Sequence, residues 1–198
     1  MQESTPWKDK IVLDLGAGTG FHISHFQKEA RHVFAVEPHD ASRLLAMKRV
    51  AELNLERVSI MTGSAAQVWL PDKSVDIVHI RFAYFWGPGC EPGLTELKRI
   101  IKPGGTAFII DNDLKYGTFA NWVSRCANLV RNPDEVEKFW QAQNFGLIRI
   151  PSQWQFQNRA DLEAVVRLEF SPELASQLLT EHSGTSVDYH YCLYYHQY

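Results

Sequence analysis

Short runs of apolar residues recur along the first 110 residues, separated by segments with helical periodicity. Within each run the apolar residues are continuous rather than alternating, which is typical of strands covered on both faces in a parallel sheet. The pattern predicts five strands, at residues 11–15, 33–36, 58–61, 75–80 and 106–110. It predicts helices between them, at residues 21–30, 42–53, 66–70 and 93–101. Such alternation indicates a doubly wound α/β sheet.

The pattern changes beyond residue 110. Residues 117–143 predict two helices that meet at Asn132-Pro133, because proline suits the first turn of a helix. A strand is expected within residues 145–156, then helices at 160–168 and 172–182 and a last strand within 187–198. No linker or repeat interrupts the chain, so we expect one domain, residues 1–198.

The first predicted strand runs into three alternating glycines, Gly16, Gly18 and Gly20. Glycine is needed where a strand turns sharply into a helix while its backbone lies close to a ligand, because a β-carbon would block the approach. Glu37 follows the second predicted strand, where a carboxylate can accept hydrogen bonds from both hydroxyls of a ribose. The glycines alone would fit an ordinary turn, but together with Glu37 they predict a nucleotide cofactor.

Residues around the glycines distinguish between nucleotides. A dinucleotide fingerprint requires glycine or alanine where this chain has Phe21. The phosphate loop of nucleotide triphosphatases is also missing, because no Gly-Lys-Ser/Thr follows. Asp14 precedes the first glycine, and a carboxylate there suits a positive α-amino group better than a pyrophosphate.

The order Asp14-x-Gly16-x-Gly18-x-Gly20, with Glu37 beyond it, resembles motif I and the ribose acid of the class I methyltransferases that use S-adenosylmethionine. The turn at residues 102–105, Lys-Pro-Gly-Gly, resembles the turn before their fifth strand. The resemblance covers nearly the whole chain and extends to the ubiquinone and menaquinone methyltransferases. It implies an α/β fold with a seven-stranded, mostly parallel sheet of order 3-2-1-4-5-7-6, strand 7 antiparallel, and helices on both faces.

In open α/β sheets the ligand lies beyond the carboxyl ends of the strands, so the resemblance implies cofactor contacts there. The glycine loop would hold the methionine end, and Glu37 the ribose. Ser64 stands where the family often has Asp, so we expect a weaker hold on adenine. The expected cofactor-binding residues are Asp14, Gly16, Ala17, Gly18, Thr19, Gly20, Glu37, Pro38, Gly63, Ser64, Ala65, Arg81 and Phe82.

The aromatic segment after the fourth predicted strand, residues 81–86, bears on the acceptor. It lacks the Asn/Asp-Pro-Pro-aromatic and Pro-Cys motifs of enzymes that methylate nucleic-acid bases, so we expect a small-molecule acceptor. The aromatic residues either wall a substrate pocket or plug the space beneath the next helix. A hydroxyl acceptor would pass its proton to His79, Tyr84 or Asp111, which spacing alone does not rank.

A metal is not expected. Asp111 and Asn112 resemble part of the magnesium site of catechol-type O-methyltransferases, but the fourth strand offers no matching acid and Arg81 would oppose a cation. His22 and His25 are three residues apart rather than the four of a helical metal pair. We expect both on a helix surface, although His22 is close enough to Gly20 to reach the cleft.

Composition excludes several classes of protein. The 198 residues carry a net charge of −3, without the concentrated Lys and Arg of polynucleotide-binding proteins, so no nucleic-acid partner is expected. Three cysteines at unrelated spacings indicate neither disulfides nor zinc. No apolar run approaches the ~20 residues of a membrane helix, and no signal-peptide pattern appears. We expect a cytoplasmic protein without a membrane partner, in which the tyrosine-rich residues 187–198 pack in the core or form homodimer contacts.

The sequence thus predicts an S-adenosylmethionine-dependent methyltransferase with an unidentified small-molecule acceptor. One alternative is a catalytically silent S-adenosylmethionine-binding protein, because only ten residues precede the first strand where related enzymes have a lid segment. Another is a nicotinamide-dependent oxidoreductase. Phe21 and the missing Tyr-x-x-x-Lys signature weigh against it.

Overall fold

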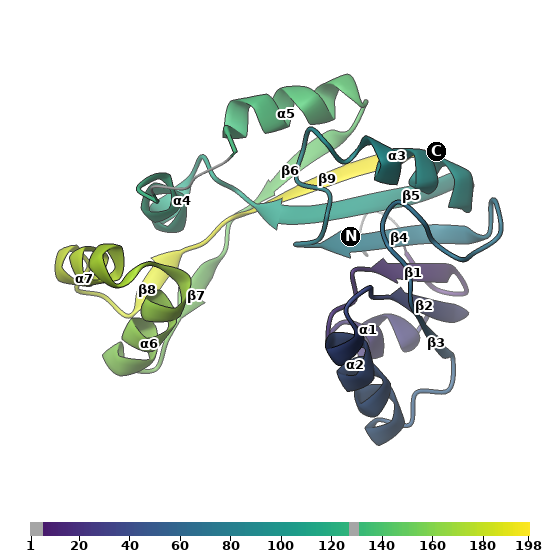
Figure 1. Cartoon of the computed structure of the whole chain (residues 1–198), viewed down its shortest axis with the longest axis horizontal. Helices are drawn as coiled ribbons and strands as arrows, with labels where there is room; N and C mark the ends of the chain where they lie inside the picture. Colours follow the sequence, from purple (N-terminus) through teal and green to yellow (C-terminus); the bar gives the residue numbers. More distant parts are fainter. Residues whose placement is uncertain (1–5, 127–130) are drawn as a thin grey trace. The chain divides into compact units, whose positions relative to one another are not determined.

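The computed structural model describes residues 6–126 and 131–198 (Figure 1). Its strands are β1 (Ile11–Leu15), β2 (His32–Val36), β3 (Val58–Met61), β4 (Val75–Arg81), β5 (Ile101–Asn112), β6 (Gly146–Ile150), β7 (Gln153–Gln155), β8 (Ser186–Asp188) and β9 (Tyr191–Gln197). Its helices are α1 (Ile23–Gln27), α2 (Asp40–Glu52), α3 (Glu91–Ile100), α4 (Gly117–Ser124), α5 (Pro133–Ala142), α6 (Arg159–Glu169) and α7 (Pro172–Glu181). Strands and helices alternate through the first half of the chain as the apolar pattern predicts, except that no helix separates β3 from β4.

Seven strands form one mixed sheet in the order β3-β2-β1-β4-β5-β9-β6. The first five are parallel neighbours. β9 runs against β5, because the Asp113 amide beyond the end of β5 donates to His190 while the Tyr198 amide donates to Gly105 near the start of β5. The predicted sheet order and its antiparallel seventh strand are therefore confirmed.

Both faces of the central strands are buried. Val12 of β1 and Ile77 of β4 point to one face and pack with Phe26 of α1. Their neighbours Leu13 and Val78 point to the opposite face and are fully buried as well. This two-sided burial is why the strands appear as continuous apolar runs.

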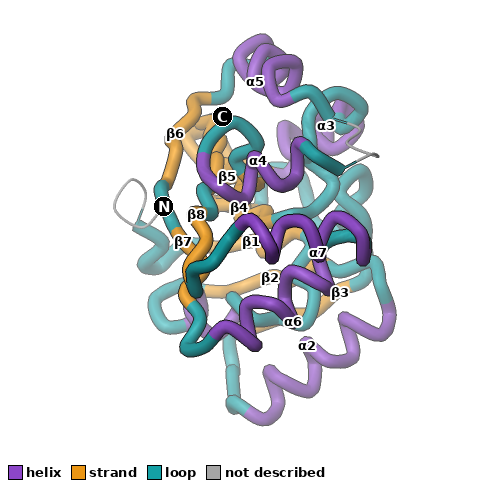
Figure 2. Tube along the Cα trace, turned by 90° about the vertical axis from the view of Figure 1, so that its left-hand side faces the viewer, coloured by secondary structure: helices purple, strands orange, loops and turns teal. Residues whose placement is uncertain are grey.

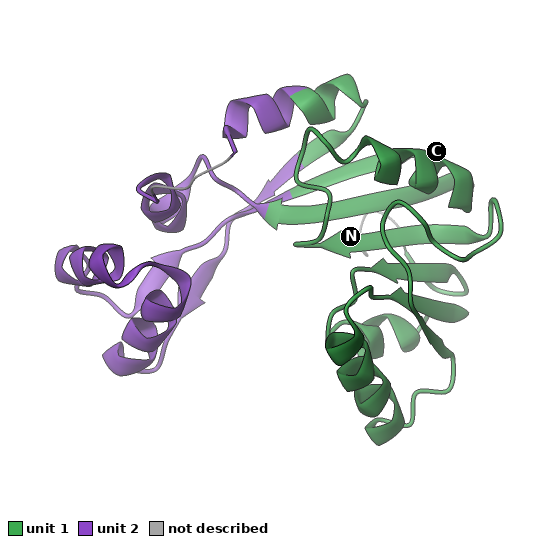
Figure 3. Cartoon of the chain, viewed as in Figure 1, with its two compact units in different colours: residues 1–111, 139–147, 193–198 green, residues 112–138, 148–192 purple. Residues whose placement is uncertain are grey.

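The chain divides into two compact units, each with its own core (Figure 3). Unit 1 comprises residues 1–111, 139–147 and 193–198, and unit 2 comprises residues 112–138 and 148–192. The core of unit 2 consists of Phe119, Trp122, Leu162, Val166, Phe170, Ala175, Leu178, Val187 and Tyr189. Unit 2 also holds a separate two-stranded sheet, β7 with β8, that the sequence pattern did not predict. The expectation of a single domain stays a prediction.

β5 begins earlier than predicted. Ile101 pairs with Val75 and Thr106 pairs with Ile77, so residues 102–105 form a bulge inside the strand rather than a turn before it. Gly104 has a φ of +81°, the conformation for which the turn prediction required glycine. The bulge therefore keeps the predicted backbone geometry while the strand extends to both sides of it.

The predicted helix at residues 66–70 is wrong. The segment is a turn with a bridge between Ser64 and Gln67, and its polar groups bond to α3. The Val68 amide donates to Glu96 at 2.7 Å, while Arg99 donates to the carbonyls of Val68 and Leu70, each at 2.9 Å. These long-range bonds replace the intrahelical ones.

Helix lengths also differ from the predictions. α1 covers only five residues of the predicted 21–30, and Phe21 before it is 69% exposed. α1 lies beside β2 (Figure 1), and α2 lies beside β3 (Figures 1 and 2). The predicted helices at residues 117–143 appear as α4 and α5, and residues 127–130 between them lie outside the described residues. No helix in the described ranges is long and apolar enough to cross a membrane.

Candidate functional site

A cavity of about 460 Å³ opens in unit 1 at the carboxyl ends of the parallel strands. Its lining residues are Leu15, Gly16, Gly18, Glu37, Pro38, Gly63, Ser64, Ala65, Arg81, Phe82, Ala83, Tyr84, Phe85 and Trp86. They are the last residues of β1 and β4 and residues from the segments that follow β1, β2, β3 and β4. Most of the predicted cofactor-binding residues therefore lie around one cavity, together with Tyr84.

The glycine loop needs its glycines for different reasons. At Gly16 φ is +79°, and a β-carbon would lie 2.5 Å from the β-carbon of Ala83. At Gly18 φ is +55°, and a β-carbon would meet no atom within 4 Å, so this residue presents open backbone to the cavity. A β-carbon at Gly20 would lie 3.1 Å from that of Ala46 on α2. The loop thus combines close packing with a bare surface for a ligand.

Glu37 is fixed at the edge of the cavity by the backbone. It is 8% exposed, and its Oε2 accepts from the Gly18 amide at 2.8 Å while Oε1 accepts from the His39 amide at 2.9 Å. Each carboxylate oxygen has a second lone pair for a further donor. The side chain can therefore accept hydrogen bonds from the paired hydroxyls of a ribose without changing its conformation.

The loop after β4 has a backbone that the sequence did not predict. Phe82 and Tyr84 have φ values of +52° and +54°, a region that bulky residues rarely occupy and that is found most often at functional sites. Phe82 and Trp86 are 39% and 46% exposed, while Phe85 is buried and contacts Gly93 of α3. Phe85 therefore packs against α3 while all four aromatic side chains of the loop line the cavity, and a substrate pocket there stays a prediction.

Asp14 and His79 form a buried pair behind the glycine loop. They are adjacent in the register of β1 and β4, each is 3% exposed, and the His79 Nδ1 lies 2.8 Å from the Asp14 Oδ1. Neither residue lines the cavity. The Asp14 Oδ2 has no hydrogen-bond partner among the described residues. The spacing of the sequence did not predict the pair, although the adjacency of β1 and β4 would have indicated it.

His22, just before α1, lies against this pair. Its ring centroid is 5.3 Å from that of His79. Burial lowers the pKa of His22, and the nearby His79, Arg81 and His25 lower it further, while Asp14 acts in the opposite direction. His22 is half-buried rather than on a helix surface as the sequence predicts.

The remaining predicted residues do not line the cavity. Ala17, Thr19 and Gly20 belong to the glycine loop without lining the cavity, and Asp111 is the last residue of the first segment of unit 1. Its neighbour Asp113, in unit 2, is 1% exposed and bonded to Arg149 at 3.0 Å. No cluster of three metal-binding side chains occurs within residues 6–126 and 131–198.

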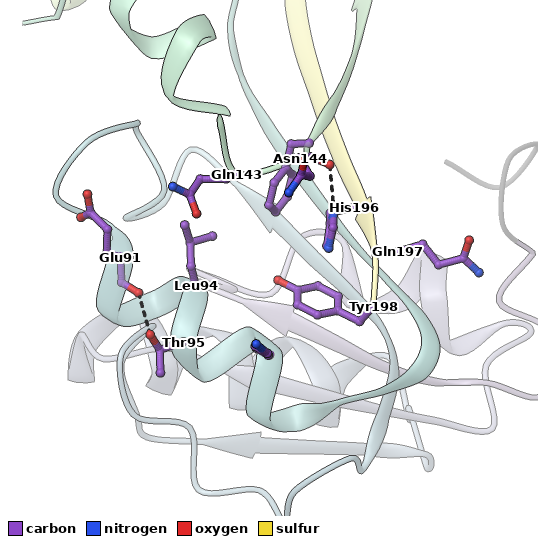
Figure 4. Close-up of a pocket in the computed structure, with 10 residues that line it drawn as sticks. Glu91, Leu94, Thr95, Gln143, Asn144, His196, Gln197 and Tyr198 are labelled. Atoms are coloured by element: carbon purple, nitrogen blue, oxygen red, sulfur yellow. Dashed lines mark hydrogen bonds between the residues drawn. The ribbon is translucent and has the colours of Figure 1, made fainter. Parts of the chain in front are cut away.

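A second cavity in unit 1, of about 520 Å³, contains none of the predicted site residues. Glu91, Leu94 and Thr95 of α3 line one side, and His196 and Tyr198 line the other (Figure 4). The His196 Nδ1 donates to the Asn144 carbonyl at 2.9 Å, which orients the ring. Burial raises the pKa of the Tyr198 hydroxyl. This cavity is separate from the glycine loop.

The family follows from sequence and fold together. Residues 12–105, which include every residue of the first cavity, match the family model of a methyltransferase domain. A putative methyltransferase from Bacillus halodurans has a similar structure, with a TM-score of 0.72 at 18% identity over 99% of this chain and 96% of that one. Residues 12–105 therefore carry a methyltransferase domain, and the chain has the fold of the class I S-adenosylmethionine-dependent methyltransferases.

Two further methyltransferases support this assignment. The uncharacterized methyltransferase Rv3342 of Mycobacterium tuberculosis is 31% identical over 134 residues, which is 66% of this chain and 51% of the relative. The chain thus spans about half the length of the curated relatives it matches. The SAM-dependent methyltransferase from Aquifex aeolicus has a TM-score of 0.61 at 18% identity, over 98% of this chain and 85% of that one. The closer resemblance to ubiquinone and menaquinone methyltransferases stays a prediction.

The residues present fit the cofactor of this methyltransferase family. S-adenosylmethionine offers a ribose diol, an adenine and an ammonium group. Glu37 is held with free lone pairs for the diol, and Gly18 leaves space beside it. The unpartnered oxygen of Asp14 is a suitable acceptor for an ammonium group.

Proposed function

We propose that the chain transfers a methyl group from S-adenosylmethionine to a small-molecule acceptor. The observation that supports this most strongly is Glu37, clamped by the amides of Gly18 and His39 at the edge of a cavity. In this proposal Glu37 holds the ribose, Ser64 and Ala65 hold the adenine, and the bare backbone at Gly18 lies along the methionine tail. The Asp14 carboxylate accepts from the ammonium group at the end of that tail.

The cofactor, when bound, supplies the methyl group on a sulfonium, so the chain need only bind, orient and exclude water. Tyr84 lines the cavity, and its hydroxyl is the proposed contact for the acceptor. His79 is buried and bonded to Asp14, so its proposed role is to position that carboxylate. Asp111 stays a proposed acceptor contact that lies outside the cavity lining.

We also propose a cytoplasmic location and no nucleic-acid partner. The three cysteines are free, which fits a reducing compartment, and the net charge of −3 disfavours polynucleotide binding. A homodimer through the tyrosine-rich end of the chain is the further expectation. Analytical ultracentrifugation would test the dimer directly.

The cofactor site is tested by titrating the protein with S-adenosylhomocysteine in a calorimeter, comparing the wild type with Glu37→Gln. An amide in place of the carboxylate keeps one acceptor but loses the charge-assisted bonds to the ribose, so we expect about 10–100-fold weaker binding. Glu91→Gln, an exposed residue of α3 outside the cavity, is the matched control and should bind normally. Wild-type affinity in Glu37→Gln would contradict the site.

Activity is tested separately, by incubating the protein with methyl-labelled S-adenosylmethionine and fractionated metabolites. The proposal predicts a labelled acceptor in at least one fraction and a dependence on Tyr84, measured with Tyr84→Phe. Tight cofactor binding with no labelled product in any fraction would instead favour the silent binding protein.

A further inference from the structure

A buried carboxylate with only one of its oxygens hydrogen-bonded is costly for the fold. Asp14 is 3% exposed, and its bond to His79 satisfies Oδ1 alone among the described residues. If the site were purely structural, an apolar side chain at this position would give a more stable fold. Asp14 directly precedes the cavity residues Leu15 and Gly16, so an unused hydrogen-bond acceptor lies behind the glycine loop.

Two histidine rings pack against this carboxylate and against each other. The ring of His79 donates to Asp14, and the ring of His22 packs edge-on against His79 at 5.3 Å. Arg81, which lines the cavity, is close enough to act on His22, as is His25. The charged and titratable groups that face His22 are therefore Asp14 on β1, His79 and Arg81 on β4, and His25 on α1.

We propose that His22 and His79 are positioning residues that couple cofactor binding to a proton, because a protonated His22 opposes the ammonium group that Asp14 accepts. This inference rests on the proposed cofactor site. His79 holds the carboxylate in place, and His22 sets the local charge. Neutral His22 leaves the carboxylate available for the ammonium, whereas charged His22 adds a positive group beside Arg81.

The sign of the pH dependence follows from this arrangement. Burial and positive neighbours hold the pKa of His22 below its ordinary value of about 6.5, so the ring is neutral at pH 7. The bound ammonium lowers that pKa further. Affinity is therefore constant above about pH 6.5 and falls as the pH drops through the pKa of His22, by up to about tenfold per pH unit for one linked proton.

The test is calorimetric titration with S-adenosylhomocysteine from pH 5 to pH 8, in buffers of different ionisation enthalpy so that released protons are counted. We expect weaker binding at low pH with release of up to one proton per ligand. 5′-Methylthioadenosine has the same nucleoside thioether without the amino-acid tail. Its affinity should not change with pH, because it places no ammonium beside Asp14.

Variants separate the coupling from a structural effect. His22→Gln should bind S-adenosylhomocysteine with a flat pH profile. His25→Gln should keep the decline at low pH but move it to higher pH, because it removes one of the groups that lower the pKa of His22. His79→Ala should lower the affinity for S-adenosylhomocysteine far more than the affinity for methylthioadenosine. His79→Asn, which can still donate to Asp14, should restore part of the affinity.

The outcomes distinguish this inference from the proposed function. If S-adenosylhomocysteine fails to bind at any pH, the cofactor site itself is wrong. If it binds tightly but with no pH dependence, or if His22→Gln retains the full decline at low pH, only the coupling is wrong. An equal decline for methylthioadenosine would also overturn it, because the tail would then be irrelevant.

Discussion

At Gly16 and Gly18 the backbone has the same left-handed sign of φ, yet the two residues face different surroundings. A β-carbon at Gly16 would overlap Ala83, whereas one at Gly18 would point into open space. The first glycine therefore serves the packing between β1 and the loop after β4, and the second leaves space for the ligand.

This difference predicts separable effects for two alanine variants. Gly18→Ala should cost about 1–2 kcal/mol in unfolding free energy from its φ alone. It should also weaken the binding of S-adenosylhomocysteine, because the added methyl group enters the cavity. Gly16→Ala has the same strain plus the overlap with Ala83, so its loss of stability should be larger. Urea denaturation with and without ligand measures both. Equal losses of stability in the two variants would contradict this division.

Sequence reasoning predicts site residues well where one residue type has one physical purpose. The glycines and Glu37 belong to this kind, and the structure places Gly16, Gly18 and Glu37 around the cavity. The sequence does not predict the left-handed backbone at Phe82 and Tyr84, because neither residue type favours that conformation. Surrounding contacts impose it, and these are not visible in local sequence.

Among the elements, α3 has a role beyond covering the sheet. Its Glu96 and Arg99 hold residues 67–72 by accepting from and donating to the backbone, and Arg99 also pairs with Asp72 at 2.6 Å. Burial by itself would raise the pKa of Glu96, but its hydrogen bond to Arg99 dominates and lowers it. This segment leads from the cavity residues after β3 to β4.

Removing Arg99 should therefore destabilise the protein. Arg99→Ala removes the donor to the carbonyls of Val68 and Leu70 and the positive partner of Glu96 and Asp72, which should cost about 2–3 kcal/mol of unfolding free energy. Lys98→Ala, exposed on the same helix, should change it by less than about 0.5 kcal/mol. Chemical denaturation compares them, and a difference within error would show that the segment has other support.

The elements that periodicity missed share one physical cause. The apolar residues Val68, Trp69 and Leu70 suggest a helix locally, but hydrogen bonds to residues 28 to 31 positions away satisfy the backbone instead. The bulge in β5 likewise depends on pairing between Ile101 and Val75. The five parallel strands were predictable because burial on both faces leaves a continuous apolar run, whereas such long-range bonds leave no local pattern.

At the scale of the whole molecule, each of the two units has its own hydrophobic core, and the first cavity is built from unit 1 alone. The aromatic core of unit 2 includes Leu162 of α6, which is fully buried, whereas Leu168 of the same helix is 85% exposed. Substituting these two leucines tests whether the stability of unit 2 affects the affinity for the cofactor.

Leu162→Ala should destabilise the protein by about 2–5 kcal/mol, because it leaves a void in that core. Leu168→Ala should be nearly neutral. Where the Leu162 variant is folded, its affinity for S-adenosylhomocysteine should stay within about twofold of wild type, since no cavity residue is lost. A large drop in affinity in a fully folded Leu162→Ala variant would mean that unit 2 contributes to the cofactor site.

The chain enters unit 2 at residue 112, returns to unit 1 for residues 139–147, and returns again for its last six residues. Neither unit is therefore a continuous stretch that could be excised. A truncation after residue 111 would strip β9 from its neighbour β5 and leave a long apolar strand edge able to pair with other molecules. Insoluble aggregates, rather than a minimal methyltransferase, are the expected product of such a truncation.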